Sequence, residues 1–158
     1  MSESKEKTGK KESQLSFIFA IGKQAFGLPP STVLEVLSVA NITRVPFTPD
    51  WVEGVISARG KVIPVIDLIG YFGIEQESKD ARTRLIILGV GDISFGIACD
   101  RIIGMEEIET RALEETMSHL PKTLRDCSKA QVKREDLLIV LLDTKALLEQ
   151  SRDRVQAG

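Results

Sequence analysis

The sequence predicts a mainly β protein made of two similar halves, each a small barrel of short strands. Three observations lead to this prediction: a hairpin pattern occurs twice, a strand that runs through aspartate into a short helix also occurs twice, and the strands are short and numerous. Short strands of this kind favour small barrels over an open sheet. The length of 158 residues suits a single domain.

The hairpin is the first repeated element. The apolar runs Phe17–Ile21 and Leu85–Val90 each lead into a glycine turn and then a returning apolar run, Ala25–Leu28 and Ile93–Cys99 respectively. The two hairpins align without a gap at a spacing of 69 positions, as in Phe17 and Ile86. Both are therefore predicted to be antiparallel strand pairs.

The second repeated element is a strand that ends in aspartate. Val62–Asp67 has this form, and Leu138–Asp143 repeats it 76 or 77 positions later, depending on the alignment. Each aspartate is expected to cap the helix that follows, Leu68–Phe72 or Thr144–Leu148, and Gly73 is expected to end the first of these. Two ordered matches at similar spacing favour duplication over chance recurrence. Because a half of roughly 70 residues has a marginal core, the halves are expected to share an apolar interface.

The segment that follows the first hairpin is less regular. Val33–Leu37 fits a helical turn or a strand equally well. Thr48 and Pro49 are expected to open a short helix that Gly54 closes.

A third hairpin is expected next, with Val55–Ala58 and Lys61–Ile66 as its arms and Arg59-Gly60 at its tip. Because proline cannot donate to a ladder, Pro64 indicates an edge strand or a bulge.

The two ends of the chain are polar. Residues 1–13 hold four lysines and three glutamates and are expected to be a disordered tail, followed by one domain over residues 14–150. Residues 151–158 are expected to fray. The chain has no apolar run that would suit a secretory signal or a membrane span, so a cytoplasmic protein without membrane insertion is expected.

Composition argues against several function classes. A net charge of −2 and an aromatic content of 5% disfavour a nucleic-acid-binding module, which needs basic residues and stacking aromatics. Two cysteines and one histidine are too few for a zinc site or a disulfide scaffold, so no metal and no cofactor are expected.

No catalytic motif stands out. Gly54–Val62 looks like a phosphate-binding loop, but its spacing is one residue too long and a strand follows where a helix is needed. His119 stands alone in a polar stretch and is expected in a solvated loop. Cys99 is expected in the core, and Cys127 at the surface as an inert thiol. These features disfavour an enzyme, with a small hydrolase as the alternative.

Arg59 is the most distinctive polar residue, because the arms of its hairpin are otherwise apolar. Glu35 lies in another apolar segment and is available to pair with it. From the residues alone, a role in recognition and an ordinary exposed turn arginine remain equally open.

The sequence also resembles a known family. Gly54–Leu68, GVISARGKVIPVIDL, closely resembles the signature of the CheW coupling-protein family, and Ile42–Pro46, Phe95–Ile97 and Leu138–Asp143 fit the family pattern as well. The resemblance extends from about Ser16 to Gln150. The chain departs from the pattern at Ser57-Ala58, where an Asn-Leu pair is usual, and in residues 125–133, which lack a common glycine.

The resemblance implies two five-stranded SH3-like barrels packed as one domain with short helices. It implies a non-enzymatic chemotaxis adaptor that links the cytoplasmic tips of chemoreceptors to the regulatory domain of the histidine kinase CheA, in arrays at the membrane. A coupler for another kinase system, such as surface motility or development, is the alternative.

The resemblance also implies a receptor-binding groove between the barrels. The positions that match receptor-facing residues of the family are Val33, Glu35, Gly54, Arg59, Gly60, Gly96, Ile102 and Met105. Glu35 and Arg59 match an ion pair on the family surface. Such an exposed pair contributes only about 0–1 kcal/mol to stability, so its value is expected to lie in shaping the groove.

Overall fold

The computed structural model of the protein describes residues 12–39, 41–76, 82–116 and 118–157. Most of the expected polar tail, residues 1–11, lies outside this part of the chain. Its last residue, Ser13, already belongs to the first strand.

The described chain is mainly β, as predicted. The strands are β1 (Ser13–Ile21), β2 (Gln24–Leu28), β3 (Val33–Ser38), β4 (Val52–Ala58), β5 (Lys61–Ile66), β6 (Arg84–Val90), β7 (Ile93–Cys99), β8 (Arg101–Glu109), β9 (Ser128–Arg134) and β10 (Leu137–Leu142). The helices are η1 (Pro30–Thr32), α2 (Leu68–Phe72), η2 (Thr110–Ala112), α3 (Lys122–Asp126) and α4 (Thr144–Ala157). The segment 33–37, which the sequence left open, is therefore a strand.

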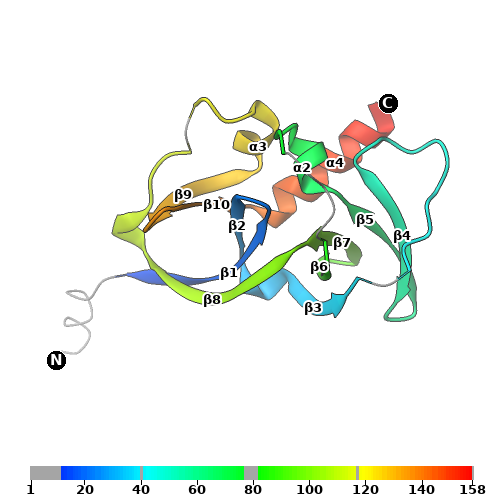
Figure 1. Ribbon diagram of the computed structural model, residues 1–158, viewed down its shortest axis with the longest axis horizontal. Coiled ribbons are helices and arrows are strands. Elements are labelled where there is room, and N and C mark those ends of the chain that lie inside the picture. Colours follow the sequence, from blue (N-terminus) through cyan, green and yellow to red (C-terminus); the bar gives the residue numbers. More distant parts are fainter. Residues whose placement is uncertain (1–11, 40, 77–81, 117, 158) are drawn as a thin grey trace.

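The strands form two five-stranded sheets with equivalent topology. Sheet 1 has the order β8-β1-β2-β10-β9, and sheet 2 has the order β3-β6-β7-β5-β4. If β1–β5 are repeat 1 and β6–β10 are repeat 2, each sheet combines an opening hairpin from one repeat with three strands from the other. The duplication that the sequence predicts is thus present, but the repeats exchange strands, and neither repeat forms a sheet alone (Figure 1).

Each sheet curls into a small SH3-like barrel whose two edges are joined by a single bridge. In sheet 2, Thr43 and Val55 exchange two backbone hydrogen bonds of 2.9 and 2.8 Å, which links the segment after β3 to β4. In sheet 1, Glu114 and Gln131 do the same at 2.8 and 2.9 Å, which links the segment after β8 to β9. The two bridges occupy equivalent places in the two repeats.

The apolar runs of the sequence are buried on both faces of the sheets. In β1, Ile18 packs inside sheet 1, whereas its neighbours Phe17 and Phe19 pack in a central cluster between the sheets. In β6, Ile87 packs inside sheet 2 and Ile86 in the same central cluster. Because both faces of these strands are covered, consecutive residues are apolar rather than alternating. The expected shared interface between the halves is confirmed.

Turns and caps follow the sequence closely. The β4–β5 hairpin turns at Arg59-Gly60, both with positive φ (54° and 74°). Asp143 caps α4, since its Oδ1 accepts from the amide of Ala146 at 3.1 Å. Asp67 stands at the equivalent position before α2, but its side chain makes no capping hydrogen bond to that helix, so the cap expected there is absent; its carboxylate lies 3.6 Å from Arg82 Nη2 instead. Gly73 ends α2 in the left-handed conformation, as expected.

Two local expectations in sheet 2 differ from the structure. The short helix expected from Thr48 to Gly54 is absent from the described chain, because Thr48 Oγ1 donates backward to the carbonyl of Val45 instead of capping forward amides. Gly54 lies within β4. Pro64 lies on an interior strand, at a point where β5 pairs with β4 only, since its pairing with β7 begins at Val65.

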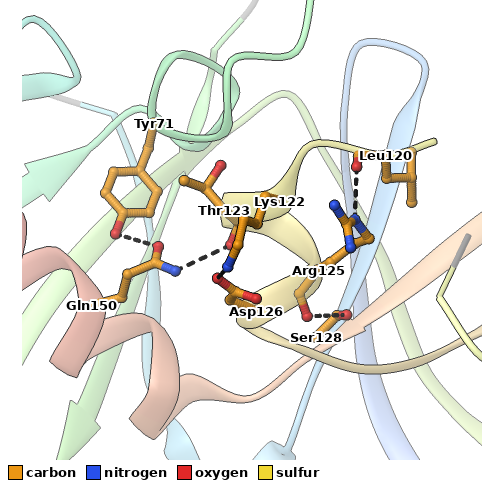
Figure 2. Close-up of polar contacts among 8 residues, drawn as sticks. All are labelled: Tyr71, Leu120, Lys122, Thr123, Arg125, Asp126, Ser128 and Gln150. Atoms are coloured by element: carbon orange, nitrogen blue, oxygen red, sulfur yellow. Dashed lines mark hydrogen bonds and ion pairs between the residues drawn. The ribbon is translucent and has the colours of Figure 1, made fainter. Parts of the chain in front are cut away.

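The α-helices α2, α3 and α4 gather on one side of the molecule (Figure 1). Polar contacts connect them, as Figure 2 shows: the Tyr71 hydroxyl of α2 donates to Gln150 Oε1 of α4 at 2.5 Å, and Gln150 Nε2 donates to the carbonyl of Thr123 in α3 at 3.3 Å. The expected frayed end, residues 151–158, is instead helical as far as Ala157. The reason is tertiary: Arg154 stacks over Tyr71 and Trp51, which holds the last turns of α4 against the body of the protein.

A candidate binding surface on two edge strands

The edge strands β3 and β8 lie on the side of the molecule opposite α2, α3 and α4 (Figure 1). Along both strands, half-buried and exposed residues alternate. Val33 of β3 and Ile102 of β8, 69 positions apart, point inward and pack against the central cluster. The structure thus places these two sequence-predicted site residues at equivalent positions in the two sheets, where they pack beneath the outward-facing residues of β3 and β8.

Four of the seven outward positions of the two strands carry apolar side chains. Leu34 and Val36 of β3 are exposed, and so are Ile103 and Met105 of β8, at the same spacing of 69 positions. Leu34 and Ile103 also fall where each ladder shifts register by one residue. Exposed apolar residues on edge strands commonly mark interaction sites. We call Leu34, Val36, Ile103 and Met105 the apolar edge residues.

An ion pair spans the two edges of sheet 2. Arg59 Nη1, at the tip of the β4–β5 hairpin, lies 3.4 Å from Glu35 Oε1 on β3. Gly60 occupies the same tip and has open space around it. The ion pair between Arg59 and Glu35, which the family resemblance implies, is therefore formed, and it lies at a partly exposed position of β3. Both side chains are well solvated, so the pair adds little to stability.

An equivalent ion pair spans the edges of sheet 1. Arg134, next to the β9–β10 turn, contacts the carboxylate of Glu106 on β8 and also donates from Nη2 to the carbonyl of Glu107 at 3.0 Å. Sequence reasoning missed this pair, because residues 105–136 carried no motif. In each sheet, therefore, an arginine of the hairpin at one edge forms an ion pair with a glutamate of the strand at the opposite edge.

Two of the sequence-predicted site residues are buried and act through the fold. Gly54 is buried in β4 with φ of 146°, and a Cβ there would lie 2.3 Å from the carbonyl oxygen of Thr43. Gly96 is buried in β7 between the side chains of Leu85 and Ile87. Neither presents a side chain to a partner, so both shape the strands that support the surface.

The family resemblance names Met105 as a site residue but does not name the other three apolar edge residues. The signal was available: extending the spacing of 69 positions from the hairpins to the next strand pairs Leu34 with Ile103 and Val36 with Met105. The same alternation then separates inward from outward residues.

The histidine and the two cysteines, residue types that often act in catalysis, lie at an exposed turn and in the core. His119 is exposed in the turn before α3, as expected. Cys99 is buried, as expected, but Cys127 is also completely buried, against the expectation of a surface thiol, because it joins the central cluster between α3 and β9. Burial raises the pKa of both thiols to about 12, so neither is a nucleophile near neutral pH. The described residues hold no group of His, Cys, Asp and Glu that suits a metal ion.

The part of the chain that the structure describes contains no helix with both the length and the apolar character needed to cross a bilayer.

Comparison with known proteins gives consistent matches. The family model described as CheW-like domain matches residues 16–152. The chain is 31% identical over 143 residues to the chemotaxis protein CheW of Helicobacter pylori, covering 88% of this chain and 84% of that protein. It is 30% identical over 148 residues to Protein FrzA of Myxococcus xanthus, covering 89% of each chain. A crystal structure of the scaffolding protein TtCheW from Thermoanaerobacter tengcongensis matches with a TM-score of 0.71 and 28% identity, covering 83% of this chain and 89% of that one.

Proposed function

The chain belongs to the CheW-like domain family, and on this premise we propose that it is a non-enzymatic adaptor that couples the cytoplasmic tips of chemoreceptors to the histidine kinase CheA. The observation that carries the proposal is the row of apolar edge residues on β3 and β8, which is exposed, repeated in both halves and bordered by an Arg–Glu pair on each sheet. Such a surface suits an elongated apolar partner better than a small substrate.

The proposed mechanism is structural. The tip of a helical hairpin lays its apolar side chains against the apolar edge residues, and the ion pairs Arg59–Glu35 and Arg134–Glu106 hold β3 and β8 in position. The kinase regulatory domain binds strand edges elsewhere on the barrels. Signalling then shifts the active population of the kinase by as much as the contacts of the adaptor differ between the two kinase states. Receptors would bring the protein to the membrane.

A coupler for another kinase system is the second candidate. The chain matches Protein FrzA about as well as it matches CheW of Helicobacter pylori, and it is 29% identical over 107 residues to Protein PilI of Pseudomonas aeruginosa. Identification of the kinase and receptor that copurify with the protein separates the two candidates, since the same surface serves both.

Substitutions on the edge strands test the proposal. Val36→Glu or Met105→Glu puts a charge into the apolar contact and is expected to weaken binding of a receptor cytoplasmic fragment by at least about tenfold in a titration. Both side chains are exposed, so the fold is retained, as circular dichroism checks. Arg59→His and Gly60→Asp, at the hairpin tip, are expected to weaken the same interaction.

Val155→Glu is the matched control, because Val155 is an exposed apolar residue on α4, which lies on the side of the molecule opposite β3 and β8 (Figure 1). It is expected to leave receptor binding unchanged. If the wild-type protein captures neither receptor fragment nor kinase regulatory domain, the adaptor function is wrong. If it captures both and the edge-strand variants bind as well as wild type, the function stands but the surface is misassigned.

A further inference from the structure

Phe47 is an unusual residue in the loop between β3 and β4. Its side chain is fully exposed, and its backbone adopts φ of 64°, a left-handed conformation that a bulky residue adopts at a cost. Prolines at positions 46 and 49 flank it and restrict the loop. An aromatic ring held out in this way has little conformational freedom to lose on binding, so it is suited to anchoring an interface.

An apolar pocket of about 260 Å³ lies beside this loop, between sheet 2 and the C-terminal half of α4. Trp51, Phe95 and Leu148 are nearly buried members of its lining, whereas Ile93 and Val155 are exposed. A dry apolar cavity of about 150 Å³ is enough to hold benzene, so the pocket has room for a phenyl ring.

The ring and the pocket lie on neighbouring parts of the chain. Trp51 and Val52, which line the pocket, follow Phe47 by four and five residues. Phe47 is nevertheless fully exposed and does not fill this pocket in its own chain. In a twofold dimer the same patch of both copies meets, so a ring that lies beside a pocket on one copy faces the pocket of the other copy.

The charges around the two features are complementary as well. The Phe47 loop continues through Asp50 to Glu53 at the start of β4, with Arg44 on its other side. Among the described residues that line the pocket, Arg152 of α4 is the charged one. When the ring of one copy enters the pocket of another, the acidic end of the loop approaches Arg152.

We propose that this face binds a second copy of the chain, with Phe47 of each protomer in the pocket of its partner. The contact is small, so the dimer is weak and depends on concentration. The contact surface is formed by the loop between β3 and β4 and by α4, which packs against sheet 2. It does not include the apolar edge residues of β3 and β8. The proposal is therefore independent of the proposed function.

Sedimentation velocity of the purified full chain, over a concentration series up to about 1 mM, tests the proposal. Wild type is expected to shift from monomer to dimer. Phe47→Asn removes the ring while keeping a residue that tolerates positive φ, and it is expected to raise the dimer dissociation constant at least about tenfold. Val155→Asp, at an exposed position of the pocket, is expected to have the same effect, because it places a negative charge where the acidic end of the partner's loop approaches. Val62→Thr, an exposed apolar position outside the pocket, is expected to change nothing.

A charge reversal gives a second, independent readout. Arg152→Asp and Asp50→Arg are each expected to weaken the dimer, and the two together are expected to restore it, because the attraction across the interface is then re-formed with opposite signs. A chain that is monomeric throughout the series overturns the proposal, and so does a dimer that Phe47→Asn leaves intact. If wild type is monomeric while Phe47→Asn weakens binding to a kinase regulatory domain, the loop serves that partner and the dimer is wrong.

Discussion

Two glycines that the family resemblance assigns to the receptor site have different roles at the level of single residues. Gly54 is packed against the Thr43 backbone, and its neighbour Val55 forms the bridge that joins the edges of sheet 2. Gly60 has a positive φ at the hairpin tip, but no atom lies close to where a Cβ would be. Stability therefore depends on Gly54 far more than on Gly60.

Alanine substitution is expected to separate these two roles. Gly54→Ala should lower the free energy of unfolding by about 3 kcal/mol or more, because its Cβ has no room and the left-handed backbone is strained. Gly60→Ala should cost only about 1 kcal/mol, for the backbone conformation alone. Urea denaturation measures both. Equal losses of unfolding free energy for the two variants would show that the close contact with the Thr43 backbone is not the reason for glycine at position 54.

The two buried thiols are expected to make the free energy of unfolding decrease at alkaline pH. Burial, reinforced by nearby acidic side chains, raises the pKa of Cys99 and Cys127 from 9.0 to about 12, and burial raises the pKa of Tyr71 from 10.0 to about 12. Above pH 9 the unfolded chain loses thiol protons that the folded chain keeps. Stability should therefore be unaffected by these groups below pH 9 and fall between pH 9 and 12, by about 1.4 kcal/mol per pH unit for each thiol.

Denaturant titrations at several pH values check this fall. The variant Cys99→Ala/Cys127→Ala is the control, and its stability should decline less steeply over the same interval, since Tyr71 remains. A decline as steep as that of wild type would mean that the thiols do not cause it.

At the scale of elements, α4 connects the two sheets. It begins at the end of β10 in sheet 1 and reaches across to line the pocket against sheet 2. Arg154 secures its far end, with the guanidinium 4.2 Å from the ring centre of Tyr71 and 5.3 Å from that of Trp51, and with Nη1 donating to the carbonyl of Tyr71 at 2.9 Å. Arg154 thus holds the last turn of this helix against Tyr71 and Trp51.

Arg154→Ala is expected to lower the free energy of unfolding by about 1–2 kcal/mol, since it removes the cation–π contacts and the hydrogen bond together. Glu149→Ala, on the exposed side of the same helix, should change stability by less than about 0.5 kcal/mol. Thermal denaturation measures both, and hydrogen exchange should show that amides near residue 154 lose protection. Unchanged protection there would contradict the role given to Arg154.

At the scale of the whole molecule, the exchange of strands between repeats makes the two halves interdependent. Repeat 1 supplies β1 and β2 to sheet 1 but β3, β4 and β5 to sheet 2, and repeat 2 supplies the rest of each sheet. The central cluster also draws residues from both sheets and from α2, α3 and α4. Neither half can complete a barrel or cover its own apolar strands.

Fragment complementation is expected to show this dependence. Fragments 1–76 and 77–158 should each be unfolded alone and should gain strand structure when mixed in equal amounts, because only the pair provides all five strands of each sheet. Circular dichroism and the dispersion of amide NMR signals measure the gain. A fragment that folds by itself, or a mixture that stays unfolded, would contradict the strand exchange.

The sequence by itself determined the local elements and the existence of a duplication. The hairpins, the aspartate cap of α4, the end of α2 at Gly73 and the Arg59-Gly60 turn depend on residues that are near one another in the chain, so turn and cap chemistry predicts them. The Arg59–Glu35 pair followed only from family resemblance.

Only the tertiary structure decided how the repeats combine and which side chains face outward. Strand exchange, the burial of Cys127, the second ion pair at Arg134 and the full length of α4 all arise from contacts between residues that are far apart in the sequence. The sequence of a short apolar strand does not specify which neighbouring strand it pairs with. That choice follows from which arrangement buries both faces of every central strand at once, and this is a property of the whole chain.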